Sequence, residues 1–287
     1  MSQGAAKKPE VFYLDEEIKS VKEGGILDYR TDRLPIWCPG CGFFGITDAL
    51  TRVVKDLGIQ PHELMMISGI GCTGRFPFFM KGYGAHVLHG RALPVATGAK
   101  TANPDLNVLV LTGDGDCMGI GVGHLPHAAR RNVDMVCVLF DNNIYGLTKG
   151  QTSPTTPDMQ VTNSHPYGSP DQPLDPVKFV LSAGATFVAR GYAGRPKDLT
   201  VIFKEAFQHK GFSFVHCMSP CVTFDKVNYT YPRLDELVMT LPKRHDYTNF
   251  GMAMERALDD ELFLGLFYKV EKETFGERMA AYAQRGA

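Results

Sequence analysis

Several features that would narrow the function are missing from this 287-residue sequence. No apolar run approaches the roughly 20 residues that a membrane helix needs. The formal net charge of −1 offers no basic surplus for binding nucleic acid. Residues 1–22 are polar and mixed in charge, unlike a secretory signal peptide. These absences argue against a membrane or nucleic-acid-binding protein and predict a globular protein of the cytoplasm.

Cysteine is scarce, and its pattern is informative. The seven cysteines form an odd number, which argues against a disulfide framework and favours thiolate ligands or buried thiols. Cys117 and Cys137 lie in or beside apolar stretches, so we expect them in the core. The cysteines that remain as candidate ligands are Cys38, Cys41, Cys72, Cys217 and Cys221.

Short apolar segments alternate with helix-length segments through the middle of the chain. Helical spacing covers Phe43–Leu57, and further helices are expected at Met118–Arg131 and Lys197–Gln208. Apolar runs typical of buried strands lie at Leu64–Ile67, Asn107–Leu111, Asp134–Phe140 and Phe212–Val215. Wholly apolar strands that alternate with helices are typical of a parallel sheet covered on both faces. The sequence therefore predicts a doubly wound, mostly parallel α/β domain.

The expected α/β domain covers residues 43–226. We interpret residues 1–42 as an irregular arm (to Leu34) followed by a cysteine loop, and residues 227–287 as a peripheral C-terminal extension that is helical over Asn249–Tyr282. The segment from Asn142 to Pro176 is rich in Pro, Thr, Ser and Asn. A loop of this length inside a compact domain is usually functional.

Two polar loops follow two of the predicted strands. Thr112–Asp116 (TGDGD) ends one strand, and Asp141–Gly146 (DNNIYG) ends the next. Glycines let backbone amides approach a diphosphate, and a carboxylate in such a turn suits Mg²⁺. Gly-Asp-Gly alone is equally compatible with an ordinary turn. Its coupling to Asn142 across one helix and one strand favours a shared metal–diphosphate site.

This order resembles the thiamine-diphosphate signature of decarboxylases and 2-oxoacid enzymes. The resemblance makes the Asp114 and Asn142 side chains and the Ile144 carbonyl ligands of Mg²⁺. It places the diphosphate beside Gly113, Gly115 and Asp116. Thiamine enzymes also need a Glu against the aminopyrimidine ring, presented by a second domain. The chain has room for only one such domain, so we expect that Glu on a partner subunit and name no catalytic residue here.

From the residues alone, Cys38-Pro-Gly-Cys41 fits a redox dithiol, a zinc site or an iron–sulfur cluster. Thioredoxin-like proteins place their motif after the first strand of a different fold, which argues against a dithiol. The pair together with Cys72 and either Cys217 or Cys221 supplies four thiolates. Zinc and an iron–sulfur cluster both accept such a set.

The motifs taken together resemble the β subunit of 2-oxoacid:ferredoxin oxidoreductases, and in particular the 2-oxoglutarate type. They run in order through about two thirds of the chain, at Trp37–Gly42 (WCPGCG), Ser68–Arg75 (SGIGCTGR), His89–Gly98 (HGRALPVATG), Gly113–Asp116 (GDGD), Asp141–Gln151 (DNNIYGLTKGQ) and Ser219–Cys221 (SPC).

The resemblance implies thiamine diphosphate, Mg²⁺ and one [4Fe-4S] cluster, the last held by Cys38, Cys41, Cys72 and Cys221. Cys217 is the main competitor for the fourth position. Further cofactor contacts are expected at Ile70, Gly71, Cys72, Thr73, His89, Gly146 and Leu147. The implied partners are an α subunit, in an αβ or (αβ)₂ complex, ferredoxin, a 2-oxoacid and coenzyme A.

The segment after Asn142 is expected to select the 2-oxoacid. Pyruvate-specific relatives tend to carry Asn and Gly where this chain has Leu147 and Lys149. A cation there would pair with a second, distal carboxylate, and Arg75 is another basic candidate. We therefore predict 2-oxoglutarate as the preferred substrate. The sequence does not set the direction of the reaction.

Two other classes of function compete with this interpretation. One is a thiamine-dependent decarboxylase or lyase subunit with a structural zinc site. The other is a zinc-dependent interaction module without an organic cofactor, which the metal–diphosphate signature disfavours.

Overall fold

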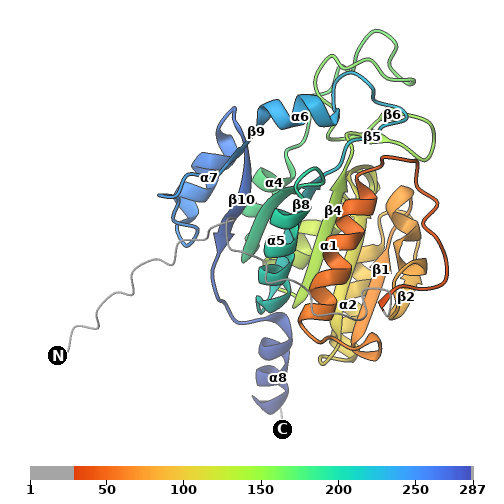
Figure 1. Cartoon of the computed structure of the whole chain (residues 1–287). Coiled ribbons are helices and arrows are strands. Elements are labelled where there is room, and N and C mark those ends of the chain that lie inside the picture. Colours follow the sequence, from red (N-terminus) through yellow and green to blue (C-terminus); the bar gives the residue numbers. More distant parts are fainter. Residues whose placement is uncertain (1–28, 286–287) are drawn as a thin grey trace.

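The computed structural model describes residues 29–285 and centres on an eight-stranded sheet (Figure 1). The strand order is β2-β1-β3-β4-β8-β7-β10-β9. Every neighbouring pair is parallel except β7 and β10. The strands are β1 (Leu64–Ser68), β2 (Tyr83–His86), β3 (Asn107–Gly113), β4 (Met135–Asp141), β7 (Phe187–Tyr192), β8 (Phe212–Met218), β9 (Val238–Thr240) and β10 (Leu262–Lys269). The predicted mostly parallel α/β fold is confirmed.

Helices cover both faces of this sheet. On one face α1 (Phe43–Asp56) and α5 (Pro196–Gln208) share a core cluster with alternate strand residues such as Leu109 and Leu111. On the other face α2 (Ala92–Ala102), α3 (Leu125–Arg131), α4 (Pro176–Ser182) and α7 (Phe250–Leu258) pack on the intervening residues. Cys117 and Cys137 lie in this second cluster, which confirms them as core residues.

Shorter elements fill the connections. The segment predicted as one helix over Met118–Arg131 is instead a short π-helix η4 (Gly115–Ile120), the turn η5 (Val122–His124) and α3. Three glycines in this stretch, at positions 119, 121 and 123, weaken a regular helix. The remaining short elements are η2 (Pro61–Glu63), η3 (Cys72–Phe78), the hairpin strands β5 (Ile144–Tyr145) and β6 (Gln151–Thr152), α6 (Tyr231–Leu237) and α8 (Phe275–Arg285).

The prediction of one helix over Asn249–Tyr282 was wrong. This segment forms α7, then β10, then α8, and β10 pairs antiparallel with β7 inside the sheet. The strand sequence LFLGLFYK is apolar on both sides, so it satisfies two buried faces. The C-terminal residues therefore extend the central sheet instead of lying at its periphery.

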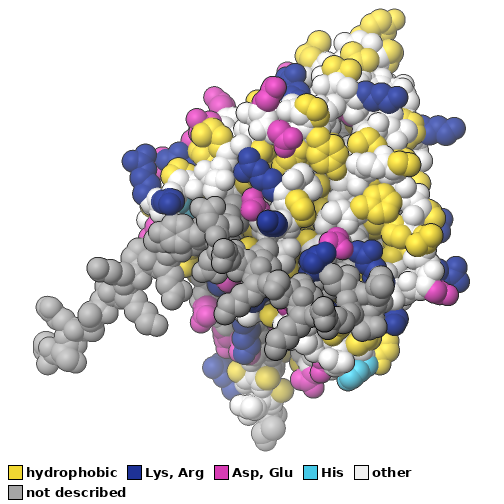
Figure 2. All heavy atoms as spheres, viewed as in Figure 1, with side chains coloured by type: hydrophobic (Ala, Val, Ile, Leu, Met, Phe, Trp, Pro, Cys, Tyr) yellow, Lys and Arg dark blue, Asp and Glu magenta, His cyan; other side chains and the backbone are white. Residues whose placement is uncertain are grey.

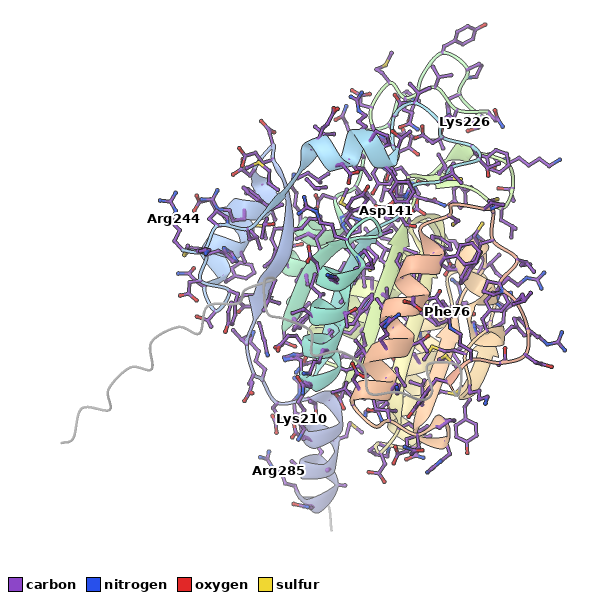
Figure 3. All side chains as sticks on the ribbon, in the orientation of Figure 1. Phe76, Asp141, Lys210, Lys226, Arg244 and Arg285 are labelled. Carbon is purple, nitrogen blue, oxygen red and sulfur yellow. The ribbon has the colours of Figure 1, made fainter. Side chains whose placement is uncertain are left out.

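The domain boundaries at residues 42 and 226 stay predictions, and residues 1–28 of the expected N-terminal arm lie outside the described part of the chain. Among residues 29–285, no helix combines the length and the apolar character needed to cross a membrane. The carboxyl ends of β1, β3, β4 and β8 meet at one edge of the sheet. Asp141 marks that edge, and Lys210 lies at the opposite end of the molecule (Figure 3).

Candidate functional site

A pocket of about 130 Å³ opens at the carboxyl ends of β1, β3 and β4. It is lined by all the residues that the sequence predicted as cofactor contacts or magnesium ligands, namely Ile70, Gly71, Cys72, Thr73, His89, Gly113, Asp114, Gly115, Asp116, Asn142, Ile144, Gly146 and Leu147. Phe43, Phe140, Tyr145 and Thr148 complete the lining. Segments far apart in the sequence therefore meet because parallel strands end at the same edge.

Asp114 lies at the buried end of this pocket. Its Oδ2 accepts hydrogen bonds from the hydroxyls of Ser153 (2.6 Å) and Thr155 (3.0 Å). Burial and then the nearby Asp141 carboxylate raise the pKa of Asp114 to about 8. A divalent cation would offset the charge of two buried carboxylates. Asp114, the Asn142 amide and the Ile144 carbonyl are oxygen donors of the kind that Mg²⁺ prefers, so the donor set fits this ion.

Ser153 and Thr155 were not singled out from the sequence. They belong to the long Asn142–Pro176 loop, which was expected to be functional only because of its length. Thr156 Oγ1 donates to the Asn143 carbonyl at 2.5 Å, and Asn143 Nδ2 donates to the Thr155 carbonyl at 2.7 Å. The hydroxyl-rich run QTSPTT is the signal in the sequence, because short polar side chains of this kind bond readily to nearby backbone.

Asp116 lines the cofactor pocket, and its carboxylate also accepts four hydrogen bonds from the surrounding segments. Its Oδ1 accepts from Ile70 N (3.0 Å), His89 Nδ1 (2.6 Å) and Gly90 N (2.7 Å). Its Oδ2 accepts from Thr112 Oγ1 at 2.7 Å. The carboxylate thus joins the loop after β1, the loop before α2 and the end of β3. It borders the pocket chiefly as the group that holds these three loops together.

Position 115 has no room for a side chain because the Tyr145 ring packs against it. A Cβ at this position would lie 2.2 Å from Cε1 of Tyr145. The Tyr145 hydroxyl also donates to the Gly115 carbonyl at 3.0 Å. The Tyr145 ring therefore packs directly on the backbone that the sequence assigned to the diphosphate.

A second cavity, of about 200 Å³, is lined by Cys38, Cys41, Cys72 and Cys221. The Trp37 indole nitrogen donates to the Cys72 carbonyl at 2.7 Å, which fixes the Cys38–Cys41 loop against the turn that carries Cys72. Burial raises the pKa of the Cys41 thiol to about 12. Burial and then neighbouring thiols raise the pKa of Cys72 to about 11. If the four cysteines ionised together, a bound metal ion or cluster would offset their charge.

Cys217 is separated from this group. It is fully buried on β8 in the core cluster beneath α1 and α5, and burial raises its thiol pKa well above the ordinary value. Cys221 lies past the end of β8 and lines the cavity. Of the two candidates for the fourth position, the structure thus brings only Cys221 to the other three cysteines.

The cysteine cavity and the pocket of Asp114 share a wall formed by Phe43, Cys72, Asn142, Gly146 and Leu147. A Cβ on Gly146 would lie 3.7 Å from the sulfur atoms of both Cys72 and Cys221, and 3.3 Å from the Asn142 amide nitrogen. Gly146 thus lies within contact distance of both sites.

The three residues assigned to substrate binding do not all line one cavity. Leu147, which is 59% exposed, lines both cavities, whereas Arg75 lines only the cysteine cavity. Lys149 is exposed and lines neither. Its φ of +81° is in the left-handed region that favours glycine. A lysine held in that conformation, beside a candidate site, suggests that its side chain has a function.

Comparison with known proteins agrees with this geometry. The family "Thiamine pyrophosphate enzyme, C-terminal TPP binding domain" matches residues 68–217, and the family of the C-terminal part of the pyruvate ferredoxin oxidoreductase β subunit matches residues 221–284. The β subunit of a 2-oxoacid:ferredoxin oxidoreductase from Sulfolobus sp. is 41% identical over 85% of each chain. The chain belongs to the β subunits of the 2-oxoacid:ferredoxin oxidoreductases.

Other members of this family are similar to different extents. The β subunit of 2-oxoacid:ferredoxin oxidoreductase 2 from Aeropyrum pernix is 47% identical over 70% of this chain, and the match spans 65% of that subunit's length. A solved 2-oxoglutarate:ferredoxin oxidoreductase from Magnetococcus marinus, with 2-oxoglutarate, coenzyme A and succinyl-CoA bound, is 42% identical. It covers 97% of this chain and 94% of its own, with a TM-score of 0.90. The β subunit described here thus has a thiamine-diphosphate-binding domain, and its family name implies an α subunit.

Proposed function

We propose that this β subunit, with its α subunit, converts a 2-oxoacid and coenzyme A to acyl-CoA and CO₂ and passes two electrons through one [4Fe-4S] cluster to ferredoxin. The preferred substrate is 2-oxoglutarate, and the potential of the electron carrier sets the direction. The observation that carries the proposal is the shared wall at Gly146 between the four-cysteine cavity and the cofactor pocket. The pocket where electrons would be released is therefore next to the cavity that would hold the electron-accepting cluster.

The cofactor pocket supports thiamine chemistry through this chain's own residues. Asp114, Asn142 and the Ile144 carbonyl would hold Mg²⁺, and the glycine-rich turn after β3 would lie against the diphosphate. When bound, thiamine diphosphate supplies the carbanion that attacks a 2-oxo carbon and holds the charge left by CO₂. Asp116 keeps the three surrounding loops in place, and Tyr145 fixes the backbone at Gly115.

The spacing of the cysteines favours a cluster over a single zinc ion. A zinc ion with Zn–S bonds of about 2.3 Å holds its four sulfur atoms within about 4 Å of one another. Within residues 29–285, no three His, Cys, Asp or Glu side chains converge closely enough to ligate one metal ion. The four cysteines line one cavity of about 200 Å³ together with ten other residues. A [4Fe-4S] cluster binds each thiolate at a different iron and suits this wider arrangement.

The α subunit is proposed to complete the site. None of the residues that line the cofactor pocket in the described part of the chain is a glutamate. We infer that the α subunit supplies the Glu for the aminopyrimidine ring. The surface beside the cysteine loop is apolar, since Leu34 and Ile36 are 84% and 68% exposed. Figure 2 shows further hydrophobic side chains gathered on this side of the molecule, which suits a subunit interface.

Specificity for 2-oxoglutarate rests on charge. Arg75 lines the cysteine cavity, and Lys149 is an exposed cation two residues after Leu147, which lines both cavities. A distal substrate carboxylate would pair with one of them. Coenzyme A and 2-oxoglutarate are bound in the related enzyme from Magnetococcus marinus, which supports the same acceptor and substrate here.

Reduction of a viologen dye by the anaerobically purified αβ complex tests this function. We expect reduction that requires coenzyme A and is faster at limiting 2-oxoglutarate than at equal concentrations of pyruvate or 2-oxobutyrate. The Cys72→Ala complex should lose this activity. CO₂ release from 2-oxoglutarate without any dye reduction, from an iron-free complex, would instead support the thiamine-dependent lyase.

A further inference from the structure

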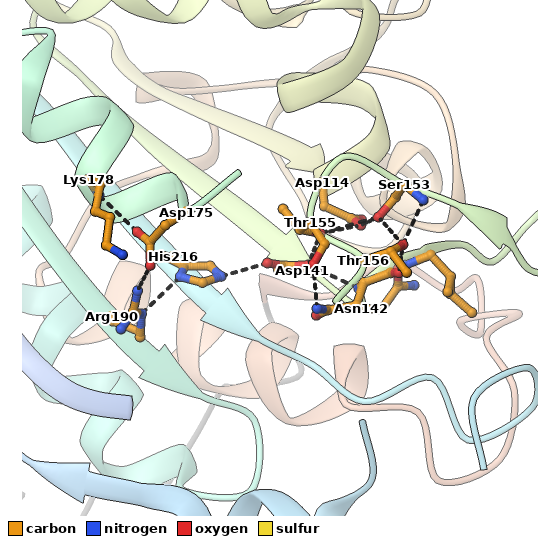
Figure 4. A network of polar contacts seen from close by, with 12 residues as sticks. Asp114, Asp141, Asn142, Ser153, Thr155, Thr156, Asp175, Lys178, Arg190 and His216 are labelled. Carbon is orange, nitrogen blue, oxygen red and sulfur yellow. Dashed lines mark hydrogen bonds and ion pairs between the residues drawn. The ribbon is translucent and has the colours of Figure 1, made fainter. Parts of the chain in front are cut away.

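The proposed Mg²⁺ ligands Asn142 and Ile144 lie in residues 142–144, which we call the metal loop. A line of buried hydrogen bonds leads from this loop across the sheet (Figure 4). His216 on β8 is in register with Arg190 on β7. Its Nε2 lies 2.8 Å from Asp141 Oδ2, and its Nδ1 lies 3.1 Å from Arg190 Nε. Arg190 also bonds Asp175 Oδ2 at 2.9 Å. The side chains of Asp141, His216 and Arg190 are only 4%, 6% and 4% exposed, so water does not replace these bonds.

The geometry fixes the protonation of His216. The Arg190 guanidinium carries only N–H donors, so His216 Nδ1 must accept. A neutral imidazole has one N–H, and here it must be at Nε2, which then donates to Asp141. Arg190 itself is held by Asp175 and by the ring of Phe267, whose centroid is 5.4 Å away. Burial opposes ionisation of Asp175, but Arg190 holds the pKa of Asp175 below its ordinary value.

The other oxygen of Asp141 shapes the metal loop. Asp141 Oδ1 accepts from Asn143 N (3.0 Å), and it shares the single Thr155 hydroxyl proton (2.9 Å) with Asp114 Oδ2 (3.0 Å). Asn143 has a φ of +59°, a left-handed conformation that Asn adopts when local hydrogen bonds support it. The loop therefore needs bonds of this kind to stay in place. Asn142 and Ile144 flank Asn143, so the same bonds orient both of them.

We propose that His216 is a positioning residue for the metal site. Arg190 holds its imidazole in the Nε2–H form, and this N–H holds the Asp141 carboxylate in the orientation that shapes residues 142–144. The inference rests on the proposed function, because it assumes that these residues ligate Mg²⁺ for the diphosphate. His216 lies inside the sheet and is not one of the predicted ligands, so the proposal adds a residue that supports cofactor binding indirectly.

Two substitutions at one position separate this role from simple packing. In His216→Gln the amide nitrogen reaches the place of Nε2 and can still donate to Asp141. In His216→Asn the shorter amide occupies the place of Nδ1 and leaves Asp141 without its donor. His209 is a matched control, because it is also buried but bonds Thr186 beside the amino end of β8. The αβ complex is stripped of cofactor with a chelator, and thiamine diphosphate retention is measured by ultrafiltration as Mg²⁺ is added.

We expect His216→Gln to need about the same Mg²⁺ concentration as the wild type for half-maximal retention. His216→Asn should need about tenfold more, as expected for the loss of about 1.4 kcal/mol from a hydrogen bond to a charged group. His209→Asn should lower the melting temperature without changing the Mg²⁺ requirement. Equal Mg²⁺ requirements for the Gln and Asn variants at position 216 would overturn the inference.

Asp141→Asn provides a second route if His216→Asn does not fold. Whichever way the new amide turns, its NH2 group faces either the His216 N–H or the backbone N–H of Asn143, and Arg190 prevents the imidazole from switching its proton. We expect it to weaken Mg²⁺-dependent retention to a similar degree, and a wild-type requirement would contradict the proposal. Retention by the wild type that is independent of divalent cations would show that the metal site itself is wrong, and the inference with it.

Discussion

Replacing Asp116 tests the organisation of the cofactor pocket most sharply. In Asp116→Ala the backbone N–H groups of Ile70 and Gly90 lose their acceptor, as do His89 and Thr112. Each buried donor left without a partner costs about 1–3 kcal/mol, so the two amides alone cost about 2–6 kcal/mol. Asp116→Asn keeps an oxygen at the position that accepts three of the four bonds and should cost about 1–2 kcal/mol.

The assay is urea unfolding of the αβ complex together with its affinity for thiamine diphosphate. We expect Asp116→Ala to lose both stability and affinity, and Asp116→Asn to lie between it and the wild type. Asp225 is a matched control, because it is a buried carboxylate that also accepts from three backbone N–H groups and one side chain, away from the cofactor pocket. Asp225→Ala should cost similar stability but little affinity. If Asp116→Ala lowered stability alone, the carboxylate would not organise the pocket.

Three further predictions concern the cysteines, the substrate and pH. Cys221→Ala should abolish iron binding, whereas Cys217→Ala should keep the iron and lose about 1 kcal/mol of stability. If iron analysis showed the reverse pattern, Cys217 and not Cys221 would be the ligand. Lys149→Gly should relieve about 1 kcal/mol of backbone strain. It should nevertheless raise the KM for 2-oxoglutarate at least tenfold more than the KM for pyruvate, because the distal carboxylate loses its cation. Equal increases in the two KM values would refute this contact. Burial lowers the pKa of His209 to about 4 from 6.5, so below pH 6.5 the unfolded chain binds a proton that the native chain excludes. The stability should therefore fall by about 2–3 kcal/mol between pH 6.5 and 4, and His209→Gln should flatten that slope in urea unfolding measured across the range.

The central strands could be predicted because each is a short apolar run between polar turns. Four strands of the sheet, β2, β7, β9 and β10, were not predicted, and for β7 and β10 the physical reason is clear. In β7 the buried Arg190 interrupts the apolar pattern, and only the distant Asp175 and His216 make that charge acceptable. In β10 eight mostly apolar residues follow a short amphipathic helix, and an apolar run of this length does not distinguish strand from helix.

The candidate metal and cysteine residues could be named from the sequence because they lie in motifs that resemble those of a known family, and the structure brings them to one edge of the sheet. The role of Asp116 in holding the loops could not be predicted, because its hydrogen-bond donors come from positions 70, 89, 90 and 112. Its adjacency to Asp114 suggested a phosphate contact, which is a local argument. The hydrogen bonds from the Ser153 and Thr155 hydroxyls to Asp114 could not be predicted for the same reason, because they depend on how a long loop folds back over the sheet.

Metal analysis combined with electron paramagnetic resonance of the anaerobic αβ complex tests the central claim most directly. We expect a brown complex with about four iron atoms per β subunit and negligible zinc. Addition of 2-oxoglutarate and coenzyme A should then produce the signal of a reduced cluster. A colourless complex that holds a single zinc ion per β subunit, and shows no signal with any 2-oxoacid, would contradict it.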